Sequence, residues 1–285
     1  MSVCDGIIAV PGLPIGSAVI IDGVVKILQR EDFVGISSVP RDVLHLVVLR
    51  GSGKGSSCNE DESEVSKQPS MQASGLVILK ESDGTCDGWT VAHKFEASTE
   101  EVSSECLDAI TIQNMTKSIR NNSMDVQRVI AYDTFTKCEK DDVKSTWNNG
   151  LVNLVTSHVL NRLCLKGNGD KIIPSSYRDI YDTENNTPET DFSDGKSIVY
   201  PPIPCVNSKM GNIRVIHHEG TKRYLSKLSP SKRTDLFVNP DRGNQLLCDV
   251  LSKYYENKWE VLIGELQFSF VVFLTMGCLS SFEHW

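Results

Sequence analysis

The stretch most suggestive of phosphate chemistry is Gly-Ser-Gly-Lys-Gly-Ser-Ser at residues 51–57. In a phosphate-binding loop, four residues separate the first glycine from the Gly-Lys pair, and a serine or threonine directly follows the lysine. Val48 and Gly55 occupy those two places. The spacing therefore excludes this motif. The polar, glycine- and serine-rich character of residues 51–72 instead predicts a disordered surface insertion.

Other catalytic and metal-binding patterns are also missing from the sequence. It contains no Gly-x-Ser-x-Gly, no His-Glu-x-x-His and no Rossmann glycine fingerprint, and its nine cysteines form no Cys-x-x-Cys. We expect His45, within an apolar run, to be a hydrogen-bonded interior histidine. The sequence thus favours a binding protein with no catalytic residues, no metal and no cofactor. An enzyme of unknown class that acts on a small substrate remains an alternative.

The charge distribution points to protein partners. The net charge of −8 disfavours charge-driven binding of nucleic acid. Residues 205–233 nevertheless hold seven basic side chains against one acidic one. This strip is either a solvated loop that neutralises the acidic half of the chain or a docking strip for an acidic protein surface. The docking candidates are Arg214, Lys222, Arg223 and Lys227.

The elements that would position these residues begin with short β-type runs. Asp22-Gly23 between two such runs predicts a hairpin with a type I′ turn. A later run at 75–80 should turn at 83–84 and pair back with 88–92. Together these segments predict a β-rich domain of two packed sheets, over the runs 7–10, 17–21, 24–28, 43–49, 75–80 and 88–92.

The spacing of the apolar residues changes after residue 126. Apolar residues at three- and four-residue steps from Trp147 to Leu163 predict one amphipathic helix that closes this domain. Residues 166–241 are rich in polar residues and proline and read as a linker with a short strand near 213–216. Asp241 can cap a helix that runs to Tyr254.

The run from Val261 to Met276 is nearly all apolar and lacks proline. It predicts a helix buried on most sides, covered by other helices, and ended by Gly277 in a left-handed conformation. Ser280 or Ser281 would cap a second helix, and either serine is a candidate phosphoswitch. A membrane span is the alternative, although the uninterrupted part is short.

This C-terminal stretch resembles a known family. Gly264, Glu265, Leu266, Gln267 and Phe268, then an aromatic and aliphatic run, then Phe282, Glu283, His284 and Trp285, are similar to the signature helix pair of the A1 cistron-splicing factor family. Gly-Ile-x-x-Val-Pro at 35–40, the following strand with His45, and the string from Trp147 to Leu163 resemble the N-terminal domain of the same family.

The resemblance implies an α+β fold: a β-sandwich-like domain with a closing helix over 1–165, a linker over 166–241, and the start of an all-α, VHS-like domain over 242–285. Relative to the family pattern, we expect the chain to carry an insertion at 51–72 and to be truncated at Trp285. The implied function is that of a splicing factor, an assembly chaperone of the U5 small nuclear ribonucleoprotein. It would bind the RNase H-like and endonuclease-like domains of the large U5 scaffold protein, associate with other U5 proteins and delay helicase docking. The implied location is cytoplasmic and nuclear.

Overall fold

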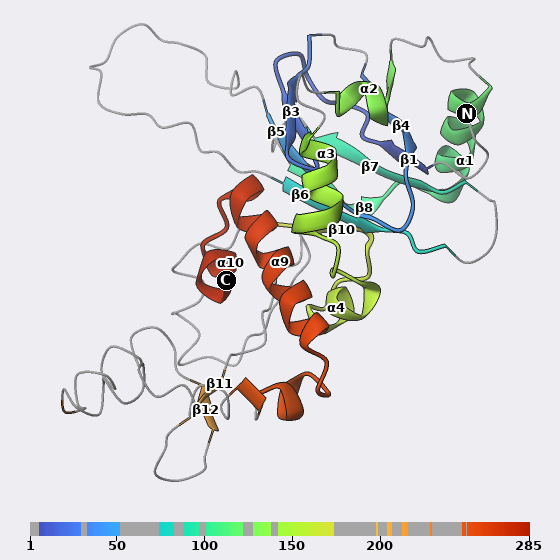
Figure 1. Cartoon of the computed structure of the whole chain (residues 1–285). Coiled ribbons are helices and arrows are strands. Elements are labelled where there is room, and N and C mark those ends of the chain that lie inside the picture. Colours follow the sequence, from blue (N-terminus) through green and yellow to red (C-terminus); the bar gives the residue numbers. More distant parts are fainter. Residues whose placement is uncertain are drawn as a thin grey trace, which may run out of the picture.

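The fold is described from a computed structural model (Figure 1). It describes residues 6–29, 33–51, 74–82, 88–96, 101–121, 128–137, 142–173 and 250–285, with residues 198, 204–206, 213–215, 229 and 247–248. Within these ranges the chain is an α+β protein, as the sequence predicts. Two sheets pack on each other, and a C-terminal helix pair lies against the outer face of one of them.

The sheet that carries the helix pair has the strand order β10-β6-β5-β2-β3, and the other has the order β8-β7-β1-β4-β9. The predicted two-sheet arrangement is therefore confirmed. The strands are β1 Gly6–Ala9, β2 Ala18–Ile21, β3 Val24–Ile27, β4 Gly35–Val39, β5 Leu44–Arg50, β6 Ser74–Leu79, β7 Thr90–Glu96, β8 Glu101–Cys106, β9 Val129–Ala131 and β10 Asn168–Ile172.

The β2–β3 hairpin is also confirmed. Ile21 pairs with Val24 across a two-residue turn. Asp22 and Gly23 both have positive φ angles, 52° and 80°. A type I′ turn requires positive φ at both central residues, and Asp-Gly tolerates this conformation well.

Strand β5 explains why the sheet of β10-β6-β5-β2-β3 is covered on both faces. Its side chains alternate between two clusters: Val47 and Leu49 face the other sheet, whereas Leu46 and Val48 face the C-terminal helices. All but the last of its seven residues are buried. The sequence of a strand that is covered on both faces is a continuous apolar run, without alternation of apolar and polar residues.

The predicted pairing of 75–80 with 88–92 is wrong. β6 pairs with β5 and β10, whereas β7 lies in the other sheet, parallel to β1 and antiparallel to β8. The chain crosses between the layers instead of folding back. Several elements were not predicted, among them strand β8 and helix α1 (Ala109–Arg120), which is capped by Asp108 accepting a hydrogen bond from the backbone N–H of Thr111.

The single helix expected from Trp147 to Leu163 is also wrong. The segment forms α3 (Asp142–Thr146), the π-helix η1 (Trp147–Leu151) and, after a break, α4 (Ser157–Arg162). Asn148, Asn149 and Gly150 are weak helix formers, and Thr156 caps a new helix by accepting from Val159 N. Trp147 is a core residue, as expected, and its indole N–H donates to the carbonyl oxygen of Leu44.

Beyond α4, strand β10 occupies residues that the sequence assigned to the start of the linker, and it adds an edge to the sheet through pairing with β6. The predicted strand near 213–216 is confirmed as β12 (Ile213–Val215), which pairs with β11 (Pro204–Val206). The rest of the linker, Asp241 and the insertion beyond Gly51 lie outside the described residues.

The C-terminal helices are α9 (Trp259–Met276) and α10 (Leu279–His284). Gly277 ends α9 with φ 70°, as predicted. The N-cap prediction is wrong: Cys278 is the N-cap of α10, so Ser280 and Ser281 lie inside that helix. The expectation that only helices cover α9 is wrong as well. Its apolar side chains share one core with Leu46, Val48 and Val77 of the sheet.

Among the described helices, α9 meets the length and hydropathy of a membrane span, with a mean hydropathy of 1.4 over 18 residues. Half of that window is buried inside the protein. Buried core helices of soluble proteins share these properties, so the observation adds little weight to the membrane alternative.

Candidate functional site

The signature residues lie where the helix pair meets the sandwich. Gly264 of α9 faces the break between η1 and α4. A Cβ at this position would stand 2.3 Å from the carbonyl oxygen of Leu154 and 2.9 Å from a methyl of Val159. Only a hydrogen atom fits there. Glycine thus allows α9 to approach the backbone of the 152–156 segment closely.

Glu265 is fully buried and holds three elements together. Arg162 Nε of α4 donates to Glu265 Oε1 at 2.5 Å, and the Tyr255 hydroxyl donates to Glu265 Oε2 at 2.9 Å. Arg162 also donates to the carbonyl oxygen of Tyr254 at 2.8 Å, and its guanidinium stacks 4.6 Å from the Tyr255 ring centroid. A buried carboxylate is tolerated only when it is paired and hydrogen-bonded in this way.

The environment of Glu265 affects its neighbours. Burial, and then the adjacent Glu265 carboxylate, raise the pKa of Tyr255, so the hydroxyl stays a hydrogen-bond donor. His284 of α10 lies 3.8 Å from Glu265 Oε2, and burial lowers its pKa to about 4. His284 therefore packs under α9 as a neutral ring at neutral pH.

Gln267 stabilises the interruption between η1 and α4. Its side-chain oxygen accepts from the backbone N–H of Leu154 at 3.0 Å. Its side-chain nitrogen donates to the carbonyl oxygen of Gly150 at 2.9 Å and to Asn153 Oδ1 at 2.6 Å. The amide thus satisfies backbone groups that a continuous helix would have paired internally.

The remaining signature residues divide between core and surface. Phe268 is fully buried and Leu266 is half-buried. Phe282 and Trp285 are about half exposed, and their rings stack on Phe273 and Phe270, with centroids 4.8 and 5.0 Å apart. The side chain of Glu283 lies outside the described residues. Most of the signature therefore joins α9 to α10 and both to the sandwich.

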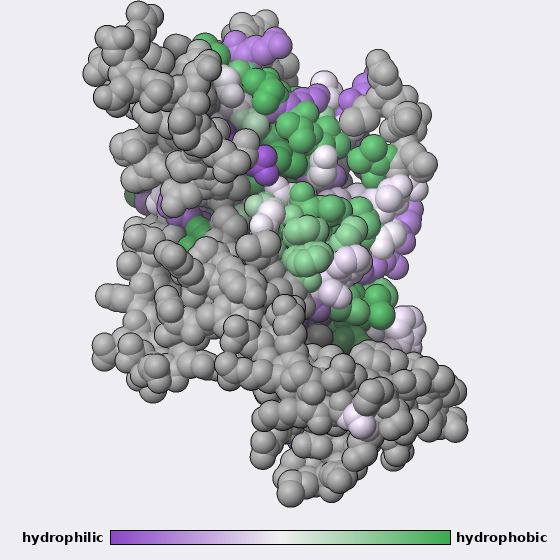
Figure 2. Space-filling view, turned by 90° about the vertical axis from the view of Figure 1, so that its left-hand side faces the viewer, coloured by the Kyte–Doolittle hydropathy of each residue, from purple (hydrophilic) through white to green (hydrophobic). Residues whose placement is uncertain are grey.

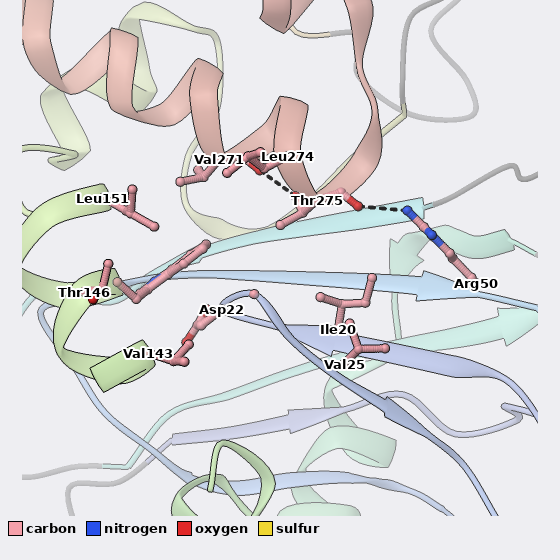
Figure 3. A pocket seen from close by; sticks show the side chains of 12 residues that line it. Ile20, Asp22, Val25, Arg50, Val143, Thr146, Leu151, Val271, Leu274 and Thr275 are labelled. Carbon is pink, nitrogen blue, oxygen red and sulfur yellow. Dashed lines mark hydrogen bonds between the residues drawn. The ribbon is translucent and has the colours of Figure 1, made fainter. Parts of the chain in front are cut away.

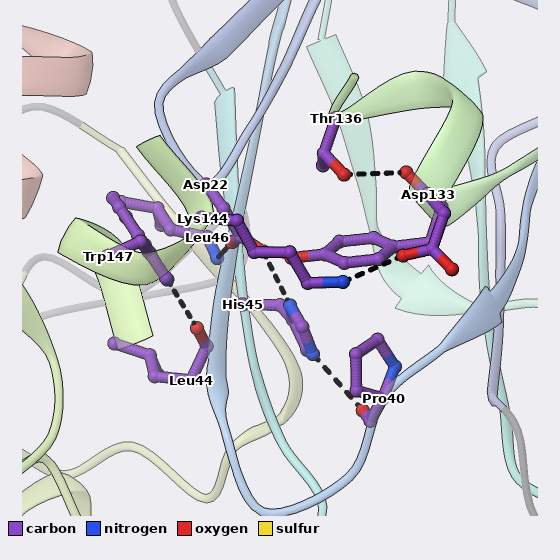
Figure 4. A network of polar contacts seen from close by, with 10 residues as sticks. Asp22, Pro40, Leu44, His45, Leu46, Asp133, Thr136, Lys144 and Trp147 are labelled. Atoms are coloured by element: carbon purple, nitrogen blue, oxygen red, sulfur yellow. Dashed lines mark hydrogen bonds and ion pairs between the residues drawn. The ribbon is translucent and has the colours of Figure 1, made fainter. Parts of the chain in front are cut away.

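A second polar network lies under the β2–β3 turn (Figure 4). Asp22 accepts three hydrogen bonds: from His45 Nδ1 at 2.7 Å, from the Tyr132 hydroxyl at 2.6 Å and from Leu46 N at 3.1 Å. Tyr132 begins α2 (Tyr132–Phe135). His45 Nε2 lies 3.1 Å from the carbonyl oxygen of Pro40.

This network confirms His45 as an interior hydrogen-bonded histidine. The ring is fully buried, both of its nitrogens lie against protein oxygens, and it does not line the groove described below. Asp22 connects the hairpin turn to β5 and α2, so the network has a structural role. Burial and the Asp22 charge raise the pKa of Tyr132, which keeps its hydroxyl a donor.

A groove of about 480 Å³ opens between the sheet, η1 and the end of α9 (Figure 3). Figure 2 views the molecule from the left-hand side of Figure 1 and shows hydrophobic side chains gathered on that side. Val25 of β3 and Leu274 of α9 are each 57% exposed at its rim. The lining consists of Ile20, Asp22, Gly23, Val25, Arg50, Val143, Thr146, Trp147, Leu151, Val271, Leu274 and Thr275.

The other predicted site residues are less informative. Ser281 is fully buried within α10, so a kinase could reach its hydroxyl only if the helix opened. The side chain of Ser280 lies outside the described residues. Arg214 lies in β12, but its side chain, and Lys222, Arg223 and Lys227 altogether, lie outside them too. The docking strip and the phosphoswitch remain predictions.

The partners of Glu265 were not predicted from the sequence. Arg162 and Tyr255 are 103 and 10 residues away from it in the chain. A carboxylate inside an apolar helix demands a buried cation, which was an available signal, but the sequence does not say which arginine supplies it. In the described ranges, no group of three or more histidine, cysteine, aspartate or glutamate side chains is arranged to hold a metal ion.

This geometry defines a class of protein: a β-sandwich on which a C-terminal helix pair is fastened through a buried carboxylate. Residues 221–285 match the family model described as the AAR2 C-terminal repeat region, so the resemblance to the A1 cistron-splicing factor family is confirmed over this part of the chain. This match supports a splicing-related role in assembly of the U5 small nuclear ribonucleoprotein. The family is one of assembly factors rather than a known enzyme family. No curated protein matches the chain.

Proposed function

We propose that this chain is an assembly chaperone of the U5 small nuclear ribonucleoprotein that binds the large U5 scaffold protein through its RNase H-like and endonuclease-like domains. The observation that carries the proposal is the match of residues 221–285 to the AAR2 repeat region. In this role the chain acts without catalysis, in the cytoplasm and the nucleus. It associates with other U5 proteins and makes no direct contact with nucleic acid or membrane.

The structure supports a binding role in two ways. The buried Glu265 network fixes α9 and α10 on the sandwich, which gives a partner a preformed surface made of both parts. The two buried histidines of the networks, His45 and His284, are packed in the interior and do not line the groove. What faces solvent between sheet and helix is a largely apolar groove, which is typical of a protein-binding surface.

Delay of helicase docking follows from mutual exclusion. If the chain and the helicase use overlapping surfaces of the scaffold protein, each reduces the binding of the other by mass action. Release of the chain would then allow the helicase to bind. No covalent step is required.

Affinity capture from a cell extract tests the proposal. The tagged chain should recover the U5 scaffold protein and other U5 proteins and leave the helicase behind. Recovery of the scaffold together with the helicase would contradict the placeholder role. Absence of the scaffold from the captured material would contradict the function as a whole.

A further inference from the structure

Helix α9 has a second apolar face besides the one that packs on the sandwich. Nine of its 18 residues are buried, and the others gather on the opposite side of the helix. Along the middle of that side run Trp259, Ile263, Leu266, Phe270 and Phe273, at alternating steps of four and three residues. These five residues, the α9 stripe, lie outside the hydrophobic cores that the described residues form. Their spacing is that of a seam between two packed helices.

The surface around the stripe is of the size that a stable interface needs. Helix α10 extends it, because Trp285 stacks on Phe270 and Phe282 stacks on Phe273. Trp259, Phe282 and Trp285 are 55, 48 and 57% exposed. An aromatic side chain has about 200 Å² to bury, so about 100 Å² of each remains for a partner. With the half-buried members of the stripe, the patch exceeds the few hundred Å² that a monomer ordinarily exposes and approaches the roughly 800 Å² per partner of a standard interface.

The chemistry of this surface selects its partner. The five stripe residues carry no charge, so the partner surface must be apolar, and their spacing requires a helix with the same spacing. Residues 221–285 match a family model described as a repeat region, and helical repeat units bury their faces against units of the same kind. The α9 helix of a second copy meets all three requirements. An uncharged surface can also meet itself about a two-fold axis without bringing like charges together.

We infer that two copies of this chain form a dimer in which the α9 stripes pack antiparallel about a two-fold axis. Leu266 of each copy then lies against Phe270 of the other, and Ile263 lies against Phe273. The antiparallel direction places the positive N-terminal end of each helix beside the negative C-terminal end of the other. This inference goes beyond the proposed function, since the dimer forms without any U5 protein.

The two ends of α9 provide positions that test the direction of pairing. In the antiparallel dimer, Trp259 of one copy lies beside Leu274 of the other. Both side chains are more than half exposed in the single chain, so substitutions there change the surface and not the core. In a parallel pair each residue would instead meet its own counterpart. Opposite charges at the two positions should therefore attract only in the antiparallel dimer.

Sedimentation velocity of the purified chain at increasing concentration is the first test. It should show a species of twice the 31.6 kDa mass of one chain, with a share that rises with concentration. Trp259→Lys and Leu274→Glu should each raise the dissociation constant of the dimer about tenfold or more. Ile110→Lys is the matched control, at a site 73% exposed on α1, which packs on the outer face of the other sheet (Figure 1). It should leave the dimer unchanged, and thermal melting by circular dichroism checks that all three variants fold.

Mixing the two variants is the second test. Trp259→Lys and Leu274→Glu together should form a heterodimer that regains most of the lost affinity. One end then joins lysine to glutamate, and the other end keeps the original tryptophan beside the original leucine. No gain on mixing would overturn the antiparallel pairing.

Three further results would overturn the inference: a chain that stays monomeric at every concentration, a control variant that weakens the dimer as much as the others, or flotation with phosphatidylcholine vesicles in place of dimer formation. Capture of the U5 scaffold protein is a separate measurement. Failure of the dimer would therefore leave the proposed function standing, and failure of the capture would leave the dimer standing.

Discussion

The carboxylate of Glu265 on α9 accepts a hydrogen bond from the guanidinium of Arg162 on α4, at 2.5 Å and in the interior of the protein. This contact joins the C-terminal helix pair to the segment that closes the β-sandwich. A buried charge pair contributes little net stability when compared with an apolar pair, but it is costly to break on one side. It therefore fixes how the two parts are placed rather than simply strengthening their contact.

Glu265→Gln should lower the free energy of unfolding by about 3 kcal/mol, because it leaves the Arg162 guanidinium without its counter-charge. Urea denaturation measures this difference. Glu260→Gln, on the exposed first turn of the same helix, is the control and should change stability by about 0.5 kcal/mol or less. Equal effects of the two substitutions would show that the buried pair does not fasten α9.

Gly264→Ala should destabilise the protein, although alanine is normally the better helix former by about 1 kcal/mol. The new Cβ would meet the carbonyl oxygen of Leu154 at 2.3 Å, and backbone cannot move aside as a flexible side chain can. We expect a net loss of about 2 kcal/mol, since overpacking typically costs 1–3 kcal/mol. Thermal unfolding measures it, and a stabilised variant would refute the close approach.

Gly277→Ala provides a comparison with a different cause. Its Cβ would meet nothing within 4 Å, but the φ angle of 70° is unfavourable for alanine. The expected loss is about 1 kcal/mol, from backbone strain alone. A larger loss than that of Gly264→Ala would mean that the helix end, and not the contact with Leu154, limits stability.

Stability should fall as the pH decreases from 6.5 to about 4. Burial lowers the pKa of His284 from its ordinary value of 6.5 to about 4 in the folded chain, so the unfolded chain binds more protons in this window. The contribution of His284 is fully present above pH 6.5 and is lost as the pH approaches 4, by at most about 3 kcal/mol. Burial also lowers the pKa of His93, so this residue adds a further loss of stability as the pH decreases.

Urea denaturation at several pH values isolates the part that belongs to His284. His284→Gln should flatten the dependence between pH 6.5 and 4 and leave only the part due to His93 and other groups. An unchanged slope in the variant would show that His284 is not buried as a neutral ring under α9.

Asp22→Asn should destabilise the sandwich by about 2 kcal/mol, because the amide replaces a charged acceptor of three hydrogen bonds. Asparagine suits the positive φ of this turn position, so the substitution tests the network and not the turn. Asp133→Asn, at a side chain 81% exposed, is the control for chemical denaturation. A loss no larger than the control's would show that the network contributes nothing.

The sequence was most informative where one local rule decides the structure. Asp22-Gly23 predicted the hairpin, and Gly277 predicted the end of α9, because these residue types favour a positive φ angle. The apolar run from Val261 to Met276 predicted a buried helix, and its bounds in the structure differ by two residues at one end. Trp147 and His45 were correctly assigned to the interior.

The failures involve tertiary contacts. Apolar spacing predicted one helix from Trp147 to Leu163, but Gln267, far along the chain, satisfies the backbone of the break. The sheet to which a strand belongs is likewise not local information, so 88–92 was paired with the wrong strand. The signature residues could be recognised from the sequence, but their role could not be predicted. Glu265 stood out as a charge in an apolar helix, whereas nothing in the sequence identified Arg162 and Tyr255 as its partners.

Competition for the purified U5 scaffold protein tests the proposed function most directly. Helicase binding to the immobilised scaffold should be measured as this chain is added in increasing amounts. We expect the chain to bind the scaffold and to displace the helicase in proportion to the scaffold occupied. Simultaneous binding of both proteins, or failure of the chain to bind the scaffold, would contradict it.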